Sequence, residues 1–195
     1  MNDTKTSSMH YTVFPSPLGW ILLASTAKGI CLLHLCGPEP LPDNKIRNRL
    51  LDYYPGSVVE PGEHLPLLRE AREAVLRYLT EGSPLPAFPL DTGKGTEFQQ
   101  EVWRALCRIP FGETRSYIEI ARAIGRPRSA RAVGQACGRN PIALIVPCHR
   151  VVAHGGGLGG YSGGLNIKAA LMKLEARETA GGTKAIPLTS HTDRA

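Results

Sequence analysis

One stretch organises this chain: Asn140-Pro-Ile-Ala-Leu-Ile-Val-Pro-Cys-His-Arg-Val151. Its five apolar residues, 142–146, lie between two prolines, which predicts a short buried strand or a tightly packed extended segment. Pro147 fixes its own φ and disfavours helix at Val146, so Cys148 leaves the segment in a set direction. The stretch therefore predicts a thiol at the edge of a core, beside a base and cations, as reactive cysteines commonly are.

Taken alone, the thiol and its neighbour have simpler explanations. A single cysteine is most often a small buried hydrophobe. Neighbouring side chains of an extended segment point to opposite faces, so His149 next to Cys148 does not by itself make a catalytic pair. The residues around them have to decide between the two interpretations.

Composition narrows the class of protein. With 195 residues, the chain can form one large domain or two small ones with a real core. No apolar run is long enough to cross a bilayer, and residues 1–9 lack the apolar segment of a secretory signal. The five cysteines include no CxxC pair. We therefore predict free thiols, a cytoplasmic location and no membrane partner.

Positive charge is concentrated in the second half. Residues 1–92 carry 8 Lys and Arg against 10 Asp and Glu, whereas residues 93–180 carry 13 against 6. Five arginines and no acid lie between Arg122 and Arg139. This asymmetry indicates a polyanionic partner, nucleic acid first, although a merely solvated basic face would look the same.

The first half has the pattern of a small α/β unit. Residues 11–14, 20–24 and 30–35 predict three strands of an antiparallel meander, preceded by a loose tail over residues 1–10. Cys31, His34 and Cys36 are close enough in sequence to suggest a metal. Because Cys31 and His34 fall on opposite strand faces and no fourth ligand is present, core and edge positions explain them better.

Helices and a linker complete this half. Asp43 is expected to cap a helix through Leu51 and beyond, and residues 67–79 predict a second helix with an apolar stripe. The Pro-rich segment 82–95 is the predicted linker. We therefore expect an N-terminal domain over residues 1–92, a C-terminal domain over 93–180 and a disordered tail over 181–195.

The second half has the pattern of a helix-turn-helix unit. Thr96 with Gln99, and Ser116 with Glu119, are capping boxes that open two helices, the second over residues 117–124. Ser129 is expected to cap a further helix over 130–137, so that two short helices flank a Gly/Pro turn. Most side chains of this last helix are small, which suits either close approach to a DNA groove or close helix packing.

A glycine-rich loop and a final helix end the pattern. Seven of the ten residues 155–164 are glycine, as expected where backbone must approach a ligand closely. The loop lacks the GK[ST] ending of a phosphate-binding loop, which argues against nucleotide hydrolysis. Residues 165–177 predict a helix whose core face includes Leu171 and Leu174.

Three motifs together resemble one family. Pro147-Cys-His-Arg150, with Arg139-Asn-Pro141 before it and Tyr161-Ser-Gly-Gly164 after it, is similar to the O6-alkylguanine-DNA alkyltransferases, over roughly residues 96–175. The resemblance implies an α/β ribonuclease-H-like N-terminal domain and a mainly α, winged-helix-like C-terminal domain with a helix-turn-helix.

The resemblance also implies a reaction. Cys148 would accept the alkyl group of O6-alkylguanine, with O4-alkylthymine as a second candidate substrate, in a single irreversible transfer. His149 would act through a water and Glu175 would orient it, while Asn140 would brace the cysteine turn. The implied catalytic residues are Cys148, His149, Glu175, Asn140, Tyr117 and Lys168. The implied substrate-binding residues are Val151, Tyr161, Ser162 and Gly163.

For DNA binding, the resemblance implies that the damaged base is rotated out of the duplex at a cost of roughly a few kcal/mol. Arg131 would fill the vacated place in the stack while the small helix lies in the minor groove. The implied DNA-binding residues are Arg128, Ser129, Ala130, Arg131, Ala132, Gly134 and Gln135.

The expected partner is double-stranded DNA bearing O6-alkylguanine, bound by a monomer without a cofactor. We predict no metal, because Thr26 stands where some family members have a zinc ligand. Two alternatives remain. A helix-turn-helix regulator or alkyl-lesion sensor would use no chemistry at Cys148, and a Cys-His hydrolase would turn over esters or amides.

Overall fold

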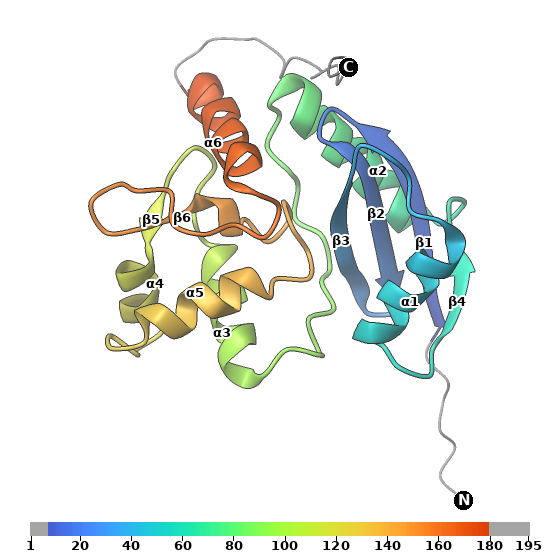
Figure 1. Ribbon diagram of the computed structural model, residues 1–195, viewed down its shortest axis with the longest axis horizontal. Helices are drawn as coiled ribbons and strands as arrows, with labels where there is room; N and C mark the ends of the chain where they lie inside the picture. Colours follow the sequence, from blue (N-terminus) through green and yellow to red (C-terminus); the bar gives the residue numbers. More distant parts are fainter. Residues whose placement is uncertain (1–7, 180–195) are drawn as a thin grey trace, which may run out of the picture.

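The computed structural model describes residues 8–179 and contains a sheet-bearing half and a helical half that lie side by side (Figure 1). The sheet is formed by β1 (Ser8–Ser16), β2 (Gly19–Thr26), β3 (Gly29–Gly37) and β4 (Val58–Pro61), in the order β3-β2-β1-β4. The pairs β1–β2 and β2–β3 are antiparallel, which confirms the predicted meander, and β4 is parallel to β1.

Strand β4 corrects the prediction at the N-terminal end. Met9 pairs with Val59 and His10 with Glu60, so residues 8–10 belong to β1 and not to a loose tail. The sequence does not reveal β4, because the strand contains only two adjacent apolar side chains, Val58 and Val59, and shows no alternating pattern. Pairing with a strand far away in sequence is what orders both segments.

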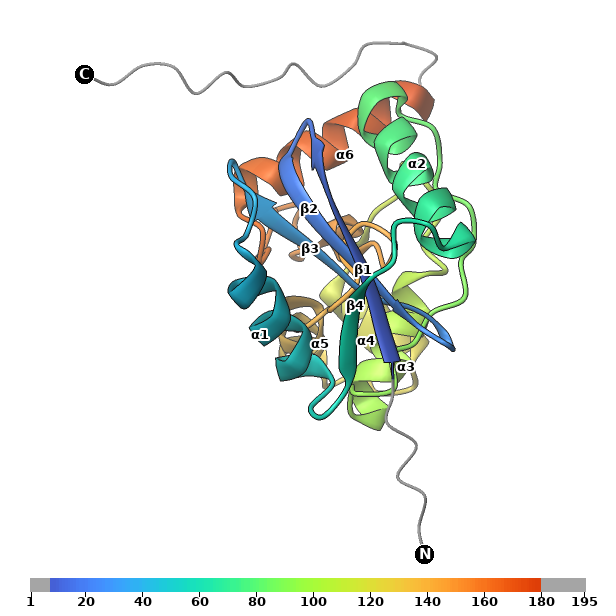
Figure 2. The ribbon, with the colours of Figure 1, turned by 90° about the vertical axis from the view of Figure 1, so that its right-hand side faces the viewer.

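Two helices cover opposite faces of the sheet (Figure 2). On one face, α1 (Asp43–Tyr53) packs Ile46 and Leu50 against strand residues such as Leu22 and Leu32. Asp43 does not cap α1: the N-cap is Pro42, and Asp43 is the first helical residue. On the other face lies α2 (Pro66–Glu81), with its predicted apolar stripe buried.

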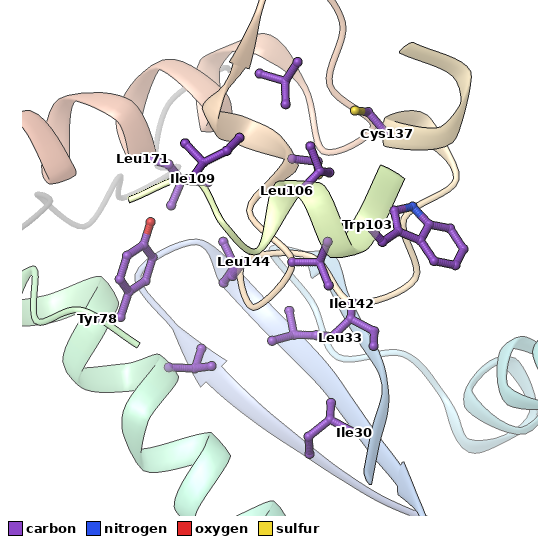
Figure 3. Packing of buried hydrophobic residues seen from close by; sticks show 14 of the residues in the cluster. Ile30, Leu33, Tyr78, Trp103, Leu106, Ile109, Cys137, Ile142, Leu144 and Leu171 are labelled. Atoms are coloured by element: carbon purple, nitrogen blue, oxygen red, sulfur yellow. The ribbon is translucent and has the colours of Figure 1, made fainter. Parts of the chain in front are cut away.

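The second face of the sheet continues into the helical half without a break. One buried cluster joins Ile30 and Leu33 of the sheet, Tyr78 of α2, and Trp103 and Leu106 of the helical half (Figure 3). The two halves therefore share a core, and each one's position depends on the other.

The helical half contains α3 (Glu97–Leu106), α4 (Tyr117–Ala123), α5 (Ala130–Gly138) and α6 (Leu165–Thr179), with a two-stranded sheet of β5 (Arg115–Ser116) and β6 (Val151–Val152). Both capping boxes form as predicted, at the N-termini of α3 and α4. Helices α4 and α5 pack against each other as a helix-turn-helix.

The start of α5 differs from the prediction. Ser129 precedes the helix but makes no side-chain capping bond, because its backbone (φ −99°, ψ 16°) lies outside the extended region that capping residues adopt. Its backbone carbonyl accepts from Val133 N–H instead. The helix itself ends at Gly138, one residue beyond the predicted end at Cys137.

Segment 142–146 is not a strand. It makes a single bridge to the sheet, in which Leu33 N–H donates to the Pro141 carbonyl and Ala143 N–H donates to the Leu33 carbonyl. Beyond that bridge the chain turns back on itself, with Leu144 at φ +66° and Val146 N–H bonded to the Ile142 carbonyl. Prolines at both ends remove two donors, which limits the pairing to one bridge.

The predicted linker is held against the sheet: Ile30 N–H donates to the Pro89 carbonyl, and Asp91 N–H donates to the Ile30 carbonyl. The tail predicted over residues 181–195 lies outside the described residues. Within residues 8–179, no helix is both long and apolar enough to cross a membrane. The same residues contain no group of three or more His, Cys, Asp or Glu side chains that could hold a metal ion.

Candidate active site

Cys148 lies at the wall of a cavity of about 440 Å³. It begins the short 3-10 helix η1 (Cys148–Arg150) and is 4% exposed. The cavity, which we call the Cys148 pocket, is lined by Tyr117, Ala130, Arg131, Gly134, Gln135, Cys137, Gly138, Cys148, Gly160 and Tyr161. Its volume lies within the range of about 300–1,000 Å³ that is usual for small-molecule sites. The buried thiol therefore faces a space large enough for a ligand.

Asn140 holds the turn that carries the cysteine. Its Nδ2 donates to the Val146 carbonyl at 2.8 Å and to Cys148 Sγ at 3.1 Å, while its Oδ1 accepts from Ile142 N–H at 3.0 Å. One side chain thus connects both ends of the turn to the sulfur. A donor at this position stabilises the thiolate form of the cysteine.

The resting thiol is not a standing thiolate. Burial raises the pKa of Cys148, and the Asn140 hydrogen bond and the positive charge of Lys168 only partly oppose it. The raised pKa favours the protonated thiol near neutral pH. Arg150, two residues after Cys148, forms an ion pair with the Glu175 carboxylate. The sulfur has to lose its proton to a base when it reacts.

Lys168, one of the implied catalytic residues, is held by backbone carbonyls. Its ammonium group is fully buried and donates to the backbone carbonyls of Val151, Leu158 and Gly160. Three donors meet three acceptors, and Lys168 does not line the Cys148 pocket. Lys168 therefore holds the glycine-rich loop and contributes positive charge near the sulfur. One of its hydrogen bonds is accepted by the carbonyl of Val151, an implied substrate-binding residue.

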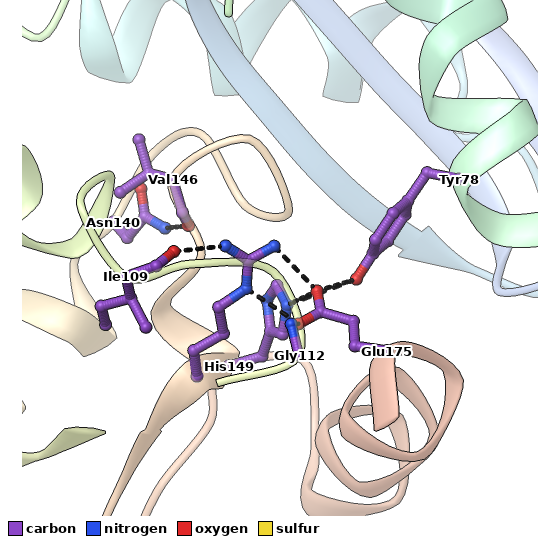
Figure 4. Close-up of polar contacts among 8 residues, drawn as sticks. Tyr78, Ile109, Gly112, Asn140, Val146, His149 and Glu175 are labelled. Carbon is purple, nitrogen blue, oxygen red and sulfur yellow. Dashed lines mark hydrogen bonds and ion pairs between the residues drawn. The ribbon is translucent and has the colours of Figure 1, made fainter. Parts of the chain in front are cut away.

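A buried network of ion pairs and hydrogen bonds surrounds the Glu175 carboxylate (Figure 4). His149 Nε2 lies 2.9 Å from Glu175 Oε1, and both side chains are almost completely buried. Arg150 makes a two-pronged contact with the same carboxylate, Nε to Oε2 at 2.9 Å and Nη2 to Oε1 at 3.0 Å. Gly112 N–H donates to Oε2 at 3.1 Å.

The fifth donor comes from the other half of the molecule. Tyr78, on α2, donates its hydroxyl to Glu175 Oε1 at 2.7 Å, and the Tyr78 hydroxyl oxygen lies 3.3 Å from His149 Nε2. We call Tyr78, Gly112, His149, Arg150 and Glu175 the Glu175 cluster.

Sequence reasoning missed Tyr78, because a tyrosine in the apolar stripe of a helix is usually interpreted as a core residue. Arg150 could have been found, since it lies within the cysteine motif.

The cluster determines the charges of its members. Burial raises the pKa of Glu175, but hydrogen bonds from His149 and Arg150 outweigh burial and bring it to about 2. Burial lowers the pKa of His149, and Glu175 opposes this only in part. Near neutral pH the carboxylate is therefore ionised and the imidazole neutral.

The tautomer of that neutral imidazole follows from its partners. An ionised carboxylate can only accept, so the ring proton lies on Nε2 and Nδ1 carries the lone pair. Nδ1 is buried and has no hydrogen-bond partner among the described residues. The ring therefore presents a free basic nitrogen on the side away from Glu175.

Aromatic side chains and glycines shape the Cys148 pocket. Tyr117 Oη has only long contacts with Gly160, 3.5 Å to its carbonyl and 3.3 Å from its N–H. Tyr161 Oη is buried and unpartnered within residues 8–179. A Cβ on Gly134 would lie 3.6 Å from the Tyr117 ring, so the small residue of α5 forms part of the wall and packs closely. This contact supports close packing as one reason for the small side chains of α5.

Of the four implied substrate residues, Tyr161 lines the Cys148 pocket, whereas Val151, Ser162 and Gly163 do not. Ser162 and Gly163 line a separate cavity of about 170 Å³ next to β3, and neither lines the Cys148 pocket. A Cβ on Gly163 would lie 2.9 Å from Tyr161 Cε1 and 3.4 Å from Leu35 Cδ1. Gly163 therefore lets the pocket wall pack against the sheet.

The implied DNA-binding residues fall into two groups. Arg128, Arg131 and Gln135 are exposed, whereas Ser129, Ala130, Ala132 and Gly134 are partly buried. Arg131 and Gln135 also line the Cys148 pocket, so its mouth lies along α5. One arginine of this region is already engaged, since Arg126 pairs with Glu101 and lies over the Phe98 ring.

Known proteins share this arrangement. Residues 97–177 match the family model described as 6-O-methylguanine DNA methyltransferase, DNA binding domain, and residues 9–91 match its ribonuclease-like domain. The methylated-DNA–protein-cysteine methyltransferase of Methanosarcina barkeri is 44% identical over 168 residues, which cover 86% of this chain and 97% of that protein. The protein of the same name from Mycobacterium tuberculosis is 65% identical over 82 residues, 42% of this chain and 50% of that protein.

Solved structures agree with the sequence matches. The crystal structure of Mycobacterium tuberculosis OGT in complex with DNA superimposes with a TM-score of 0.68 at 40% identity, covering 86% of this chain and 92% of that one. The matches span both halves of the molecule, including the cysteine turn and the shared core. A thiol at a base-sized cavity beside a helix-turn-helix thus has a known context: the chain belongs to the 6-O-methylguanine DNA methyltransferase family.

Proposed function

We propose that this protein repairs duplex DNA by moving the alkyl group of O6-alkylguanine to its own Cys148, once per molecule. The observation that carries the proposal is the Cys148 pocket, in which the acceptor sulfur and the exposed helix of the helix-turn-helix share one cavity. A base rotated out of DNA bound along α5 would reach the sulfur by that route.

The transfer is a single displacement. A water between Sγ and His149 Nδ1 relays the thiol proton to the imidazole, and the sulfur forms a bond to the alkyl carbon. The C–O6 bond breaks, its electron pair stays on guanine, and guanine regains a proton. The net change is R–O6-guanine plus Cys–SH giving R–S–Cys plus guanine, so no cofactor is required. The free lone pair of Nδ1 and the neutral state of His149 support this route.

The other residues have supporting tasks in this proposal. Asn140 stabilises the developing thiolate, and Lys168 adds positive charge while holding the glycine-rich loop. Tyr117 Oη is poorly engaged by its own chain and is available to the leaving guanine. Tyr161 forms a wall against which the base would lie.

DNA binding rests on charge and on the surface of α5. Arg131 is exposed at the mouth of the pocket, which suits a side chain that enters the duplex when the base leaves. The remaining arginines of this region would contact phosphates and make affinity salt-dependent.

We expect a monomer to suffice, because every group of the site comes from one chain. The five free cysteines are compatible with the cytoplasmic location that we propose.

The experiment is a single-turnover assay with duplex DNA that carries labelled O6-methylguanine. One label per protein is expected, located on Cys148 by mass spectrometry, with unmodified guanine left in the DNA. Cys148→Ala should remove all transfer, whereas Cys107→Ala, which alters an exposed cysteine, should leave it unchanged. Repeated turnover, or label on another residue, would refute the proposal. DNA binding without any transfer by the wild type would favour a regulator or lesion sensor.

A further inference from the structure

The buried hydroxyl of Tyr78 joins the two halves of the protein at the base of the active site. Tyr78 is completely buried on α2, and its oxygen reaches Glu175 and His149, both contributed by the helical half (Figure 4). Burying a hydroxyl is costly unless it is hydrogen-bonded. Here the bond is short and goes to a charged group, which places it among the stronger hydrogen bonds of proteins.

The direction of that bond is determined by its partners. Burial and the charge of Glu175 keep the pKa of Tyr78 well above 10, so the hydroxyl remains protonated. Glu175 carries no proton, so Tyr78 donates to it. The 3.3 Å contact with His149 Nε2 is longer and weaker than the 2.7 Å bond to the carboxylate.

Tyr78 therefore competes with His149 for one oxygen. Nε2–H of His149 and the hydroxyl of Tyr78 both donate to Oε1 of Glu175, which also receives Arg150 Nη2. Each additional donor reduces the charge that the carboxylate offers to an imidazolium ring. The charged groups that act on His149 are Glu175, which favours the imidazolium, and Arg150 and Lys168, which oppose it.

We propose that Tyr78 is a positioning residue for alkyl transfer: from the N-terminal half, it fixes the Glu175–His149 pair and keeps the imidazole free to accept the thiol proton. The inference rests on the proposed function, because it assigns Tyr78 a part in that same reaction. It also gives the N-terminal half a task in the chemistry beyond supplying a shared core.

The test compares Tyr78→Phe with Tyr54→Phe in the full-length protein. Tyr78→Phe keeps the ring and its edge contact with Phe111 but removes the hydroxyl. Tyr54 is a matched control, since its buried hydroxyl makes one hydrogen bond, 3.1 Å to the Asp91 carbonyl, outside the Glu175 cluster. The measurement is the single-turnover rate of methyl transfer to Cys148 from pH 5 to pH 9, together with duplex affinity.

For Tyr78→Phe, we expect the rate at neutral pH to fall roughly three- to tenfold, because one hydrogen bond that supports the general base His149 is lost. The acid limb of the rate profile should move to higher pH by about half a unit. Duplex affinity should not change, and Tyr54→Phe should keep both the rate and the limb of the wild type. Introducing Tyr78→Phe into a Glu175→Gln protein should have little further effect, since both act through the same carboxylate.

An unshifted acid limb with a wild-type rate in Tyr78→Phe would overturn the inference, as would an undiminished effect in the Glu175→Gln background. A second measurement needs no variant: nitrogen NMR of wild-type His149 should find the proton on Nε2 and Nδ1 bare near pH 7. A proton on Nδ1 would contradict the arrangement. A wild type that transfers nothing to Cys148 would refute the proposed function itself, so the two failures are distinguishable.

Discussion

The Glu175 cluster and the Cys148 pocket lie close together but differ in their buried polar groups. Those of the cluster are extensively hydrogen-bonded, whereas the pocket contains a buried hydroxyl without a partner among the described residues. In the cluster, the Glu175 carboxylate accepts hydrogen bonds from five donors of the described residues, and its pKa is lowered to about 2. In the pocket, burial raises the pKa of Cys148, and Tyr161 Oη has no partner among the described residues. His149 belongs to the cluster through Nε2, and its buried Nδ1 has no hydrogen-bond partner among the described residues.

The contrast shows how a protein can separate rigidity from reactivity. A saturated network holds its atoms in place but has no bonding capacity left for a substrate. Unsatisfied groups are costly, so they persist where a ligand or a reaction will use them. The cluster therefore supplies orientation, and the pocket supplies the groups that change partners.

The largest effect is expected from breaking the cluster with Glu175→Gln. An amide cannot match five donors and leaves the largely buried Arg150 without a counterion. We expect the free energy of unfolding to fall by about 3–5 kcal/mol and the transfer rate to fall about 100-fold. Denaturant titration and the single-turnover assay measure these losses. The matched control is Glu101→Gln, which breaks the surface pair with Arg126 and should cost less than about 1 kcal/mol.

The same variant tests the pH dependence of stability. The pKa of Glu175 is depressed to about 2, from an unfolded value of about 4.3. Its contribution is therefore present above the unfolded pKa and is lost as pH falls towards 2. Wild-type stability should drop across this window more steeply than that of Glu175→Gln. Parallel pH curves would mean that the carboxylate is not held as an anion.

The pocket side is probed through Asn140. Asn140→Ala removes the donor to Cys148 Sγ, and we expect a roughly tenfold to 100-fold slower transfer, as for loss of a hydrogen bond to a charged group. Asn140→Asp keeps an acceptor for Ile142 N–H but places negative charge beside the sulfur, so the pKa of Cys148 should rise further and transfer should be slower still.

The pH dependence of Cys148 alkylation by iodoacetamide, read by mass spectrometry, measures the pKa change in both Asn140 variants. The exposed Asn166, changed to Ala, serves as the control. If Asn140→Asp reacted faster than Asn140→Ala, the hydrogen bond to sulfur would not be what stabilises the thiolate.

A smaller effect separates the pocket from its mouth. Arg131→Ala should slow transfer from duplex DNA about tenfold, because base rotation costs a few kcal/mol that the side chain helps to offset. Transfer from the free O6-methylguanine base should not change. Arg126→Ala removes an arginine already paired with Glu101 and should affect neither rate. Equal losses with duplex and free base would place Arg131 in the chemistry and not at the mouth.

The smallest effect concerns the pocket wall. Gly134→Ala fits, because its Cβ would make an ordinary 3.6 Å contact with the Tyr117 ring, and it should stabilise α5 by about 0.5–1 kcal/mol. Gly159→Ala should destabilise by about 1 kcal/mol or more, since φ is +67° and the new Cβ would lie 2.7 Å from Tyr117 Oη. Thermal unfolding compares the two. Destabilisation by Gly134→Ala would show that the wall has no room.

Short-range patterns carried much of the prediction. The capping boxes at Thr96 and Ser116, the meander and the apolar stripe of α2 follow from chemistry within a few residues, and the structure confirms them. The order of residues around Cys148 was enough to indicate the family. The predicted capping roles of Ser129 and Asp43 are wrong, because a residue type that often caps helices does not guarantee capping geometry.

The sequence by itself determined most of the helices, the three-stranded meander, where positive charge gathers and which thiol lies in the family motif, because these depend on neighbouring residues. Only the tertiary structure decided that segment 142–146 turns back after one bridge, that Lys168 bonds to carbonyls of the glycine-rich loop, and that Tyr78 reaches the Glu175 carboxylate. Contacts between residues 97 positions apart, such as Tyr78 and Glu175, leave no periodic signal. They arise when two halves bury a common core and their polar groups must find partners across it.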